Sequence, residues 1–311
     1  MKKATMKDIA RLANVSVATV SYVLNNVKNQ TIPDPTRQSI LQIAKELNYV
    51  PNLAARSLVV QRTGMVGILI NKSPQLPYWK RQSYLTLVDS LESKLTASGY
   101  HTLLISLDPH NPAMDVIRER KLDAVFVVDV MEKMFYRISA NFVDGVPLIL
   151  IDSLINDRMF NQVNYNYPLA LKSAVSAAAV PSCLVMESFH NQALTTWITD
   201  SSGFSKENIY IAADPAGAPG TLEDFLQQNR GKHVIVMNEF LAKAVEHTGI
   251  ASSITALCTC GIPEIVDNGT RVIQFQNNRA ETAFELMMSL KHIQEDPRIL
   301  AGNQFLVEVL P

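Results

Sequence analysis

The sequence has few of the features that mark secreted or membrane proteins. Only three of its 311 residues are cysteines, Cys183, Cys258 and Cys260, which is too few for a disulfide framework and favours a reducing compartment. No run of about 18 apolar residues is present, so we expect no membrane span. The first ten residues, MKKATMKDIA, lack the apolar core of a signal peptide. These absences predict a cytoplasmic protein.

Motifs for catalysis and metal binding are also missing. The chain has no Gly-x-Ser-x-Gly elbow, no P-loop and no paired-carboxylate constellation, and its six histidines show no ligand spacing. Cys258 and Cys260 are one residue apart on an expected strand, so a soft-metal site or a thiol sensor is the alternative to the usual role of free cysteines as small buried hydrophobes. We therefore expect no enzyme, no metal and no cofactor.

Net charge is close to zero, but the charges are unevenly distributed. The whole chain carries a formal net charge of −1. Residues 1–62 hold nine Lys/Arg and three Asp/Glu, a balance of +6, whereas the other 249 residues hold 19 and 26, a balance of −7. A cationic head on an acidic body is typical of a nucleic-acid-binding domain joined to a ligand-binding domain.

The N-terminal stretch predicts two short helices joined by a tight turn. The first covers 6–13, with Thr5 as its N-cap and an apolar face of Ile9, Leu12 and Ala13. Ser16 caps the second, which covers 17–25. Its inward face holds Val20, Val23 and Leu24, and its outward face holds Val17, Ala18, Ser21, Tyr22 and Asn25.

A third helix is expected to cover the first two, because helices this short are unstable alone. Asp34 is its predicted cap, and Pro35 occupies the first helical position. Its apolar stripe consists of Ile40, Ile43, Ala44 and Leu47. The arrangement is a helix-turn-helix with a small supporting helix.

Two motifs in this region resemble the headpiece of the LacI/GalR family of bacterial repressors. The family pattern T-[LM]-x-D-[IV]-A-x-x-A-x-V-S-x-x-T-V-S-x-V-L-N is present from Thr5 to Asn25, and L-x-Y-x-P-N-x-x-A-x-x-L is present from Leu47 to Leu58. The resemblance is dense over residues 4–62 only. It implies a DNA-binding headpiece at 1–48 and a hinge helix at 49–62 that orders on specific DNA.

The resemblance also implies which side chains contact DNA. Val17 and Ala18 match base-reading positions, and Tyr22 stands where most members carry a guanine-binding arginine. A tyrosine cannot make that bidentate contact, so Tyr22 either reads a different base or lies on the backbone. The matched backbone-contacting positions are Thr5, Ser16, Thr19, Ser21, Asn25 and Asn52.

Two hinge residues match positions that act in the minor groove. Leu58 matches the leucine that wedges into the central step and kinks the duplex, although it could instead pack only on its dimer mate. Ala55 matches the small residue that lets the hinge backbone approach the groove.

From Thr63 onward, short apolar strands alternate with helices. Strands are expected at 65–70, 101–106, 124–128, 147–151, 182–186, 209–212, 234–237, 256–259 and 272–275. This alternation predicts a doubly wound α/β fold with parallel sheets. The resemblance implies a two-lobed, periplasmic-binding-protein-like body, with lobe 1 at about 63–156 and 274–295 and lobe 2 at about 157–273 and 296–311.

The effector cleft of the family is only partly matched. The resemblance places Tyr78, Trp79, Asp152 and Asn238 there. A ligand-anchoring arginine is absent from 190–204, and Cys258-Thr259-Cys260-Gly261 replaces the usual Gly-[FY]-Asp-Asp. Tyr78 and Trp79 either stack on a ligand or pack between the lobes. An ordinary sugar ligand is therefore disfavoured, because its hydroxyl groups would lack partners.

These features predict a DNA-binding transcriptional regulator, and specifically a repressor, that acts as a homodimer on a pseudopalindromic double-stranded operator. Dimerisation is expected because one small headpiece buries too little surface for operator affinity. A small-molecule effector of unknown class is left open, and no membrane partner is expected. A solute-binding module would need a signal peptide and no headpiece, and a sugar-processing enzyme would need a catalytic constellation. Neither alternative meets its requirement.

Overall fold

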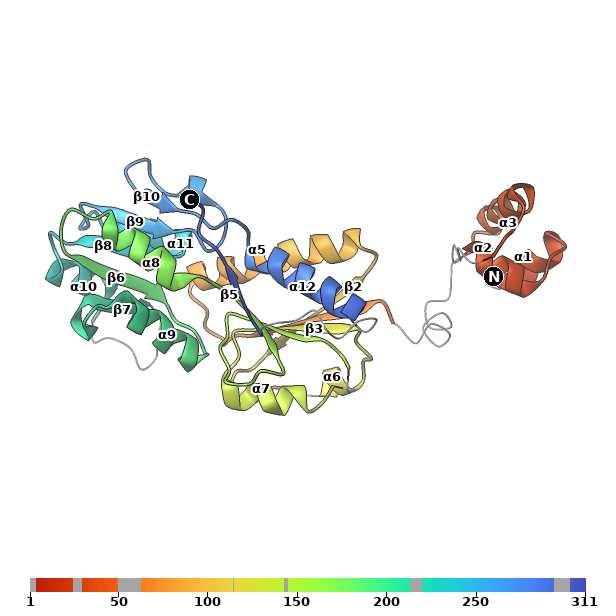
Figure 1. The fold of residues 1–311 in the computed structure, drawn as a ribbon, viewed down its shortest axis with the longest axis horizontal. Helices are drawn as coiled ribbons and strands as arrows, with labels where there is room; N and C mark the ends of the chain where they lie inside the picture. The colour runs from red at the N-terminus through yellow and green to blue at the C-terminus, as the bar shows by residue number, and fades with distance from the viewer. Residues whose placement is uncertain are drawn as a thin grey trace. The chain divides into compact units, whose positions relative to one another are not determined.

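The computed structural model describes residues 4–24, 30–49, 63–113, 115–142, 145–212, 220–293 and 303–311. The chain divides into two units, Met1–Thr63 and Gly64–Pro311, which we call the headpiece and the body. The headpiece is helical and the body contains two parallel sheets with helices (Figure 1). The predicted hinge stays a prediction, since residues 50–62 lie outside the described ranges.

The headpiece is a three-helix unit built from α1 (Met6–Leu12), α2 (Val17–Leu24) and α3 (Asp34–Glu46). Ile9, Val20 and Ile40, one from each helix, are completely buried and form the centre of its core. Since none of these helices is long enough to be stable in water alone, this shared core is what holds the helix-turn-helix in shape.

Two details of the predicted headpiece are wrong. Leu12 was expected in the core but is 56% exposed, because α1 turns Ile9 and Ala10 inward instead. Asp34 was expected to cap the third helix but is its first residue. The N-cap is Pro33, which makes no side-chain hydrogen bond.

The body contains two all-parallel sheets. The first has the strand order β11-β5-β4-β3-β1-β2. Its members are β1 (Met65–Asn71), β2 (His101–Leu107), β3 (Ala124–Val128), β4 (Leu148–Ile151), β5 (Asn161–Tyr165) and β11 (Gln304–Val307). The second has the order β10-β9-β8-β6-β7. Its members are β6 (Ser182–Glu187), β7 (Ile209–Ala212), β8 (His233–Met237), β9 (Ile254–Leu257) and β10 (Arg271–Ile273).

The predicted fold class is confirmed, but the lobe boundaries are wrong in two places. The strand β5 pairs with β4 and with β11, so both β5 and β11 belong to the first sheet, whereas both were assigned to lobe 2. The strand β5, with the sequence NQVNY, was not predicted at all. Polar side chains interrupt its apolar pattern, and burial on both faces of the sheet is visible only in three dimensions. We use first lobe and second lobe for the two sheets with their helices.

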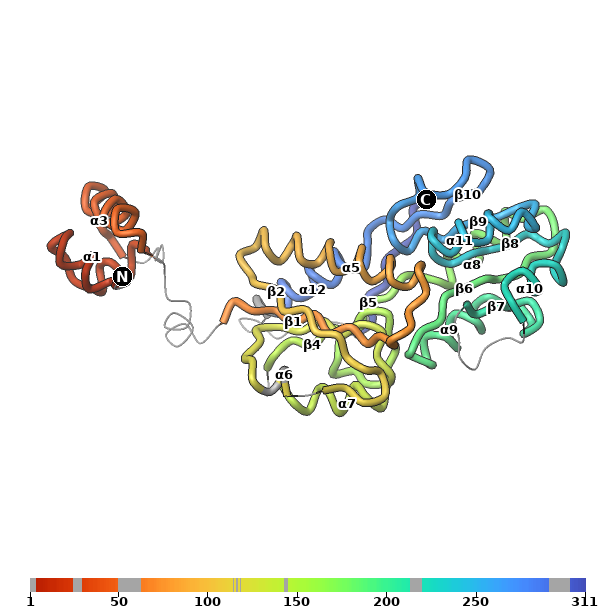
Figure 2. The backbone as a smooth tube through the Cα atoms, turned by 180° about the vertical axis from the view of Figure 1, so that it is seen from behind, coloured from red at the N-terminus to blue at the C-terminus, as the bar shows by residue number. Residues whose placement is uncertain are grey.

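The helices of the body cover the sheets and link the lobes (Figure 2). They are α5 (Tyr78–Ala97), α6 (Asp115–Arg118), α7 (Glu132–Ser139), α8 (Tyr167–Ser176), α9 (Gln192–Ser202), α10 (Leu222–Gln228), α11 (Glu239–His247) and α12 (Arg279–Ile293). No helix in the described ranges is long and apolar enough to cross a bilayer.

Helix α5 begins at Tyr78, so the predicted effector residues Tyr78 and Trp79 lie in its first turn. Most of its length packs in the first lobe beside α12, while its first turn contacts α11 of the second lobe. One continuous hydrophobic core includes buried residues of both sheets, for example Ile68 of β1 and Met186 of β6. The lobes are therefore packed directly on each other.

Candidate functional site

The recognition helix α2 begins with a well-formed cap. Asn14 lies in the left-handed region at φ 51°, which asparagine tolerates, and so allows the tight turn from α1. The Ser16 hydroxyl accepts a hydrogen bond from the backbone N–H of Thr19 at 3.0 Å. It also lies 2.9 Å from the Thr19 hydroxyl. The predicted cap is thus present, and it engages Ser16 and Thr19 with each other.

The outward face of α2 carries the three predicted base-reading residues. Val17 is 42% exposed and Tyr22 is 36% exposed, and Ala18 is also exposed. Their neighbours Val20 and Val23 are buried against the headpiece core. All three side chains therefore lie on the accessible face of α2, where they could contact another molecule.

The remaining predicted backbone contacts differ in how they are engaged. Thr5 is exposed and forms a capping box with Asp8, whose carboxylate accepts hydrogen bonds from the Thr5 hydroxyl at 2.7 Å and from its N–H at 2.9 Å. Ser21 is half-buried. The other predicted contacts lie outside the described ranges and stay predictions: Asn25, Asn52, Ala55 and Leu58.

A second group of polar residues lies where the two sheets meet. Parallel strands place their carboxyl ends at one edge, and polar side chains follow several strands at that edge in each sheet. From the first sheet these are Asp129 and Asp152, and from the second Glu187, at the end of β6. We call this group, with Lys80 and Arg279, the lobe junction.

Lys80 lies at the centre of the lobe junction and is only 5% exposed. Its Nζ is 3.2 Å from Asp129 Oδ2 and 3.1 Å from Glu187 Oε2. Burial alone lowers the pKa of Lys80, but the carboxylates of Asp129 and Glu187 outweigh it and hold that pKa above its ordinary value. The ammonium is therefore charged, and it joins one carboxylate from each lobe.

The Asp129 carboxylate is held by groups from both lobes. The Tyr84 hydroxyl donates to Oδ2 at 2.8 Å, and the backbone N–H of His190 donates to Oδ1 at 2.7 Å. The side-chain amide of Asn191 donates to the carbonyls of Val130 and Leu154, at 2.9 and 3.0 Å. These contacts connect the end of the first sheet to the loop that precedes α9 in the second lobe.

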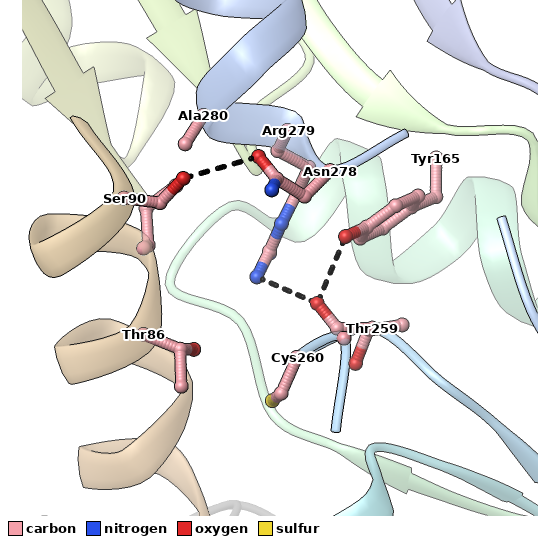
Figure 3. Close-up of a pocket in the computed structure, with 10 residues that line it drawn as sticks. Thr86, Ser90, Tyr165, Thr259, Cys260, Asn278, Arg279 and Ala280 are labelled. Carbon is pink, nitrogen blue, oxygen red and sulfur yellow. Dashed lines mark hydrogen bonds between the residues drawn. The ribbon is translucent and has the colours of Figure 1, made fainter. Parts of the chain in front are cut away.

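A second buried ion pair joins Arg279, the first residue of α12, to Asp152; both side chains are 2% exposed. Burial lowers the pKa of Arg279, but Asp152 more than reverses this, so the guanidinium is charged. Arg279 also donates to the carbonyl oxygen of Thr259, beyond β9, at 3.3 Å. Tyr165 donates to the same carbonyl at 2.9 Å (Figure 3). Of the predicted effector contact Asp152, Oδ2 is therefore already paired, whereas Oδ1 has no hydrogen-bond partner.

The other predicted effector residues are also engaged with the chain. Asn238 is fully buried, adopts φ 81°, and caps α11 by accepting from the N–H of Phe240 at 2.9 Å. Trp79 packs on the core of the second lobe. Tyr78 is 61% exposed and makes an edge-to-face contact with Phe240, at 5.8 Å between ring centroids. Trp79 thus fits the packing alternative, and only Tyr78 presents a free ring face.

Two adjoining pockets open beside Arg279. They have volumes of about 120 and 230 Å³ and share Tyr165, Gly261 and Asn278 in their walls. Thr86, Ser90, Cys260 and Arg279 line the smaller one (Figure 3). Pockets for drug-sized ligands usually measure about 300–1,000 Å³, so each of these pockets alone is below that range.

Cys258 and Cys260 follow β9, which ends at Leu257, so the expectation that they lie on a strand is wrong. Glu239 accepts hydrogen bonds from the backbone N–H groups of Cys260 and Ile262, at 2.9 and 3.0 Å. Burial and the nearby Glu239 raise the pKa of both thiols, which makes the reactive thiolate scarce. Across the described ranges, no group of three or more His, Cys, Asp or Glu residues is arranged to hold a metal.

The residues that dominate the lobe junction were not identified from the sequence. Lys80, Asp129, Glu187 and Arg279 match no motif, and they come from four separate parts of the chain. The available signals were weak: Asp129 directly follows an apolar strand, and Glu187 ends one. Their pairing could be found only from the fold.

The headpiece is similar in sequence to known bacterial regulatory proteins. Residues 5–52 match the sequence model described as "Bacterial regulatory proteins, lacI family". The chain is 30% identical over 155 residues to the HTH-type transcriptional repressor PurR of Vibrio cholerae, a match that covers 48% of this chain and 43% of that protein. It is 34% identical over 160 residues to the HTH-type transcriptional regulator RegA of Clostridium saccharobutylicum, covering 51% and 40%. The matched stretch is thus less than half of each relative.

Solved structures extend the likeness in fold to the whole chain. The lac repressor dimer bound to operator and the anti-inducer ONPF superposes with a TM-score of 0.67 at 15% identity, covering 99% of this chain and 97% of that one. A LacI-family transcriptional regulator from Silicibacter pomeroyi gives 0.61 at 16% identity, covering 98% and 97%. At these identities the similarity shows the fold.

Proposed function

We propose that the chain is a sequence-specific DNA-binding transcriptional regulator, because residues 5–52 match the lacI-family sequence model and the body has the fold of solved LacI-family structures. Its proposed action is repression, as in the relative named a transcriptional repressor. A cytoplasmic location and the absence of enzymatic activity belong to the same proposal.

The observation that carries this proposal is the recognition helix. Its cap is satisfied and its inner face is buried, and Val17, Ala18 and Tyr22 remain exposed on the outside. In the major groove, valine and alanine can contact a thymine methyl and exclude other bases by shape. Tyr22 offers one hydrogen bond or a packing surface. We therefore propose an operator in which guanine is not selected opposite residue 22.

The groups around the helix would position it on the phosphates. Thr5, Ser16, Thr19 and Ser21, together with Asn25 and Asn52, are the proposed backbone contacts. The Ser16 hydroxyl can donate to a phosphate while it caps the helix if the Thr19 hydroxyl donates to Ser16. The Thr5 hydroxyl already donates to Asp8, so it would have to exchange that acceptor for a phosphate. Ala55 and Leu58 are the proposed minor-groove residues of the hinge.

We propose that the chain binds its operator as a homodimer. The lac repressor neighbour is a dimer on its operator, which supports this arrangement. The physical reason is that a single module buries too little surface for tight specific binding, whereas two headpieces on a pseudopalindrome add their contacts.

We propose that the body does not bind a simple sugar in the predicted effector cleft. Asp152 Oδ2 is paired with Arg279 and Asn238 caps α11, so of these two residues only Asp152 Oδ1, which has no hydrogen-bond partner, could accept from a hydroxyl group without displacing an internal contact. The pockets beside Arg279 are small. A thermal-shift screen of common mono- and disaccharides and their phosphates should find no stabiliser. One sugar that raises the melting temperature and releases the operator at micromolar concentration would refute this part.

Selection of binding sites from a random duplex pool tests the proposed function. The full chain should enrich one pseudopalindromic sequence and shift it in a gel at lower concentration than a scrambled duplex. Tyr22→Ala should change or weaken that preference, whereas Leu41→Ala, at a 48% exposed position on α3, should not. Enrichment of no sequence would contradict the proposal.

A further inference from the structure

The lobe junction contains a cation that belongs to the chain itself. Lys80 Nζ lies between Asp129 of the first lobe and Glu187 of the second, at 3.2 and 3.1 Å. It is also 4.1 Å from the centroid of the Phe189 ring and 5.2 Å from that of Tyr84. Two carboxylates and two aromatic rings are what a protein uses to bind an ammonium group.

The surroundings of Lys80 are assembled from both lobes. Phe189 and Glu187 follow or end β6, whereas Tyr84 is on α5 and Asp129 follows β3. The side chains of Asp129 and Glu187 are 0% and 1% exposed. Separation of the lobes would therefore take Lys80 away from one of its two carboxylates.

Backbone hydrogen bonds at Asp129 also join the two lobes. The N–H groups of His190 and Asn191 in the second lobe donate to Asp129 Oδ1, at 2.7 and 3.4 Å. Their protection from hydrogen exchange depends on Asp129 staying in place, and Lys80 neutralises Asp129. These two amides therefore report directly on whether the lobes are held together.

We propose that the lobe junction is an ammonium-binding site and that Lys80 fills it as a built-in ligand, so the lobes stay closed without a small molecule. The consequence for operator binding rests on the proposed function: affinity for the operator should not require an effector. The site would accept a small organic ammonium only if Lys80 were removed.

Chemical rescue tests the site. Lys80→Ala removes the part of the side chain that corresponds to propylammonium. In the DNA-free full chain, exchange at His190 and Asn191 should become about tenfold faster or more. Added propylammonium should restore slow exchange, whereas 1-propanol, which has the same length and no charge, should not. Wild-type protein should respond to neither.

The matched control is Lys94→Ala on the same helix. Lys94 Nζ lies 2.6 Å from Glu281 of α12, so this pair lies within the first lobe, and both side chains are about one-third exposed. The substitution removes the same charge without touching the lobe junction. Exchange at His190 and Asn191 should stay at the wild-type rate, with or without propylammonium.

A second variant covers the case in which Lys80→Ala does not fold. Glu187→Gln keeps Lys80 beside Asp129 and removes only the carboxylate charge that the second lobe contributes to the lobe junction. It should therefore accelerate exchange by a smaller factor than Lys80→Ala. The proposal would be overturned if every variant that folds exchanged these two amides at the wild-type rate. It would also be overturned if 1-propanol slowed exchange in Lys80→Ala as much as propylammonium does. Acceleration that neither compound reverses would overturn the assignment as an ammonium site.

The exchange experiment separates this inference from the proposed function. It uses no DNA, so a chain that selects no operator would refute the regulator while leaving the exchange result unaffected. A chain that binds its operator but exchanges normally after Lys80→Ala would refute the built-in ligand alone.

Discussion

The recognition helix and the lobe junction use polar and charged side chains in opposite ways. In the headpiece, polar groups cap the helix ends, while Val17, Ala18 and Tyr22 are left exposed. At the lobe junction, charged groups pair with one another and almost nothing is exposed, although Asp152 Oδ1 and the Glu187 oxygens lack hydrogen-bond partners. The outward face of α2 is therefore available to a partner, whereas the cations of the junction are already paired within the chain.

The largest expected effect concerns the buried pair of Arg279 and Asp152. Arg279→Met leaves the Asp152 carboxylate buried without a counter-ion, and this should destabilise the body by about 3–5 kcal/mol. Urea unfolding followed by circular dichroism measures it. In the double variant Arg279→Met/Asp152→Asn most of the loss should be recovered, because the uncompensated charge is gone. If the single variant unfolds like wild type, the pair does not stabilise the junction.

The next effect separates the two units. Ile40 is completely buried in the headpiece core, so Ile40→Ala should cost about 2–5 kcal/mol there. Headpiece signals in NMR spectra should lose dispersion while the body keeps its unfolding midpoint. The neighbouring variant Leu41→Ala removes a 48% exposed side chain and should change neither. A matching shift in the body's midpoint would contradict independent units.

A smaller effect tests whether Tyr22 reads a base. Tyr22→Arg supplies a bidentate guanine donor and should favour guanine at the facing position by about 1–3 kcal/mol. Site selection with the variant and the wild-type chain measures this change. Sequence preferences that are identical at every position would place Tyr22 on the DNA backbone.

The smallest effect concerns the cap of the recognition helix. Ser16→Ala removes the acceptor for the Thr19 N–H and should destabilise the headpiece by about 1 kcal/mol. Ser16→Thr keeps the hydroxyl and should recover most of that loss. Thermal unfolding of the headpiece signals is the measurement. If both variants lose the same amount of stability, the Ser16 hydroxyl is not the source of the stabilisation.

The same comparison explains what could be predicted from the sequence. The headpiece depends on local rules, because each cap, Thr5 with Asp8 and Ser16 with Thr19, and the spacing of Val20 and Val23 involve residues only three positions apart. The junction depends on pairs that are distant in the chain, such as Lys80 with Glu187. No local periodicity encodes such a pair, and the same applies to β11, which joins the first sheet from the end of the chain.

Separation in sequence also explains which contacts in the predicted effector cleft were missed. Asp152 was correctly placed at the end of its strand, but its partner Arg279 lies 127 residues away and so remained hidden. For Trp79 the sequence left ligand stacking and lobe packing open, and only the fold shows that it packs on the second lobe. The sequence indicated where the side chains of Asp152 and Trp79 lie along the chain, but not which other side chains pack against them.

The most direct test of the account is the ratio of affinities for the selected operator and for a scrambled duplex of the same length, measured with the full chain and no added small molecule. The account predicts a ratio of at least about 10³ at physiological salt, with both affinities falling as salt increases. Equal affinity for the two duplexes, or specificity that appears only after a metabolite is added, would contradict it.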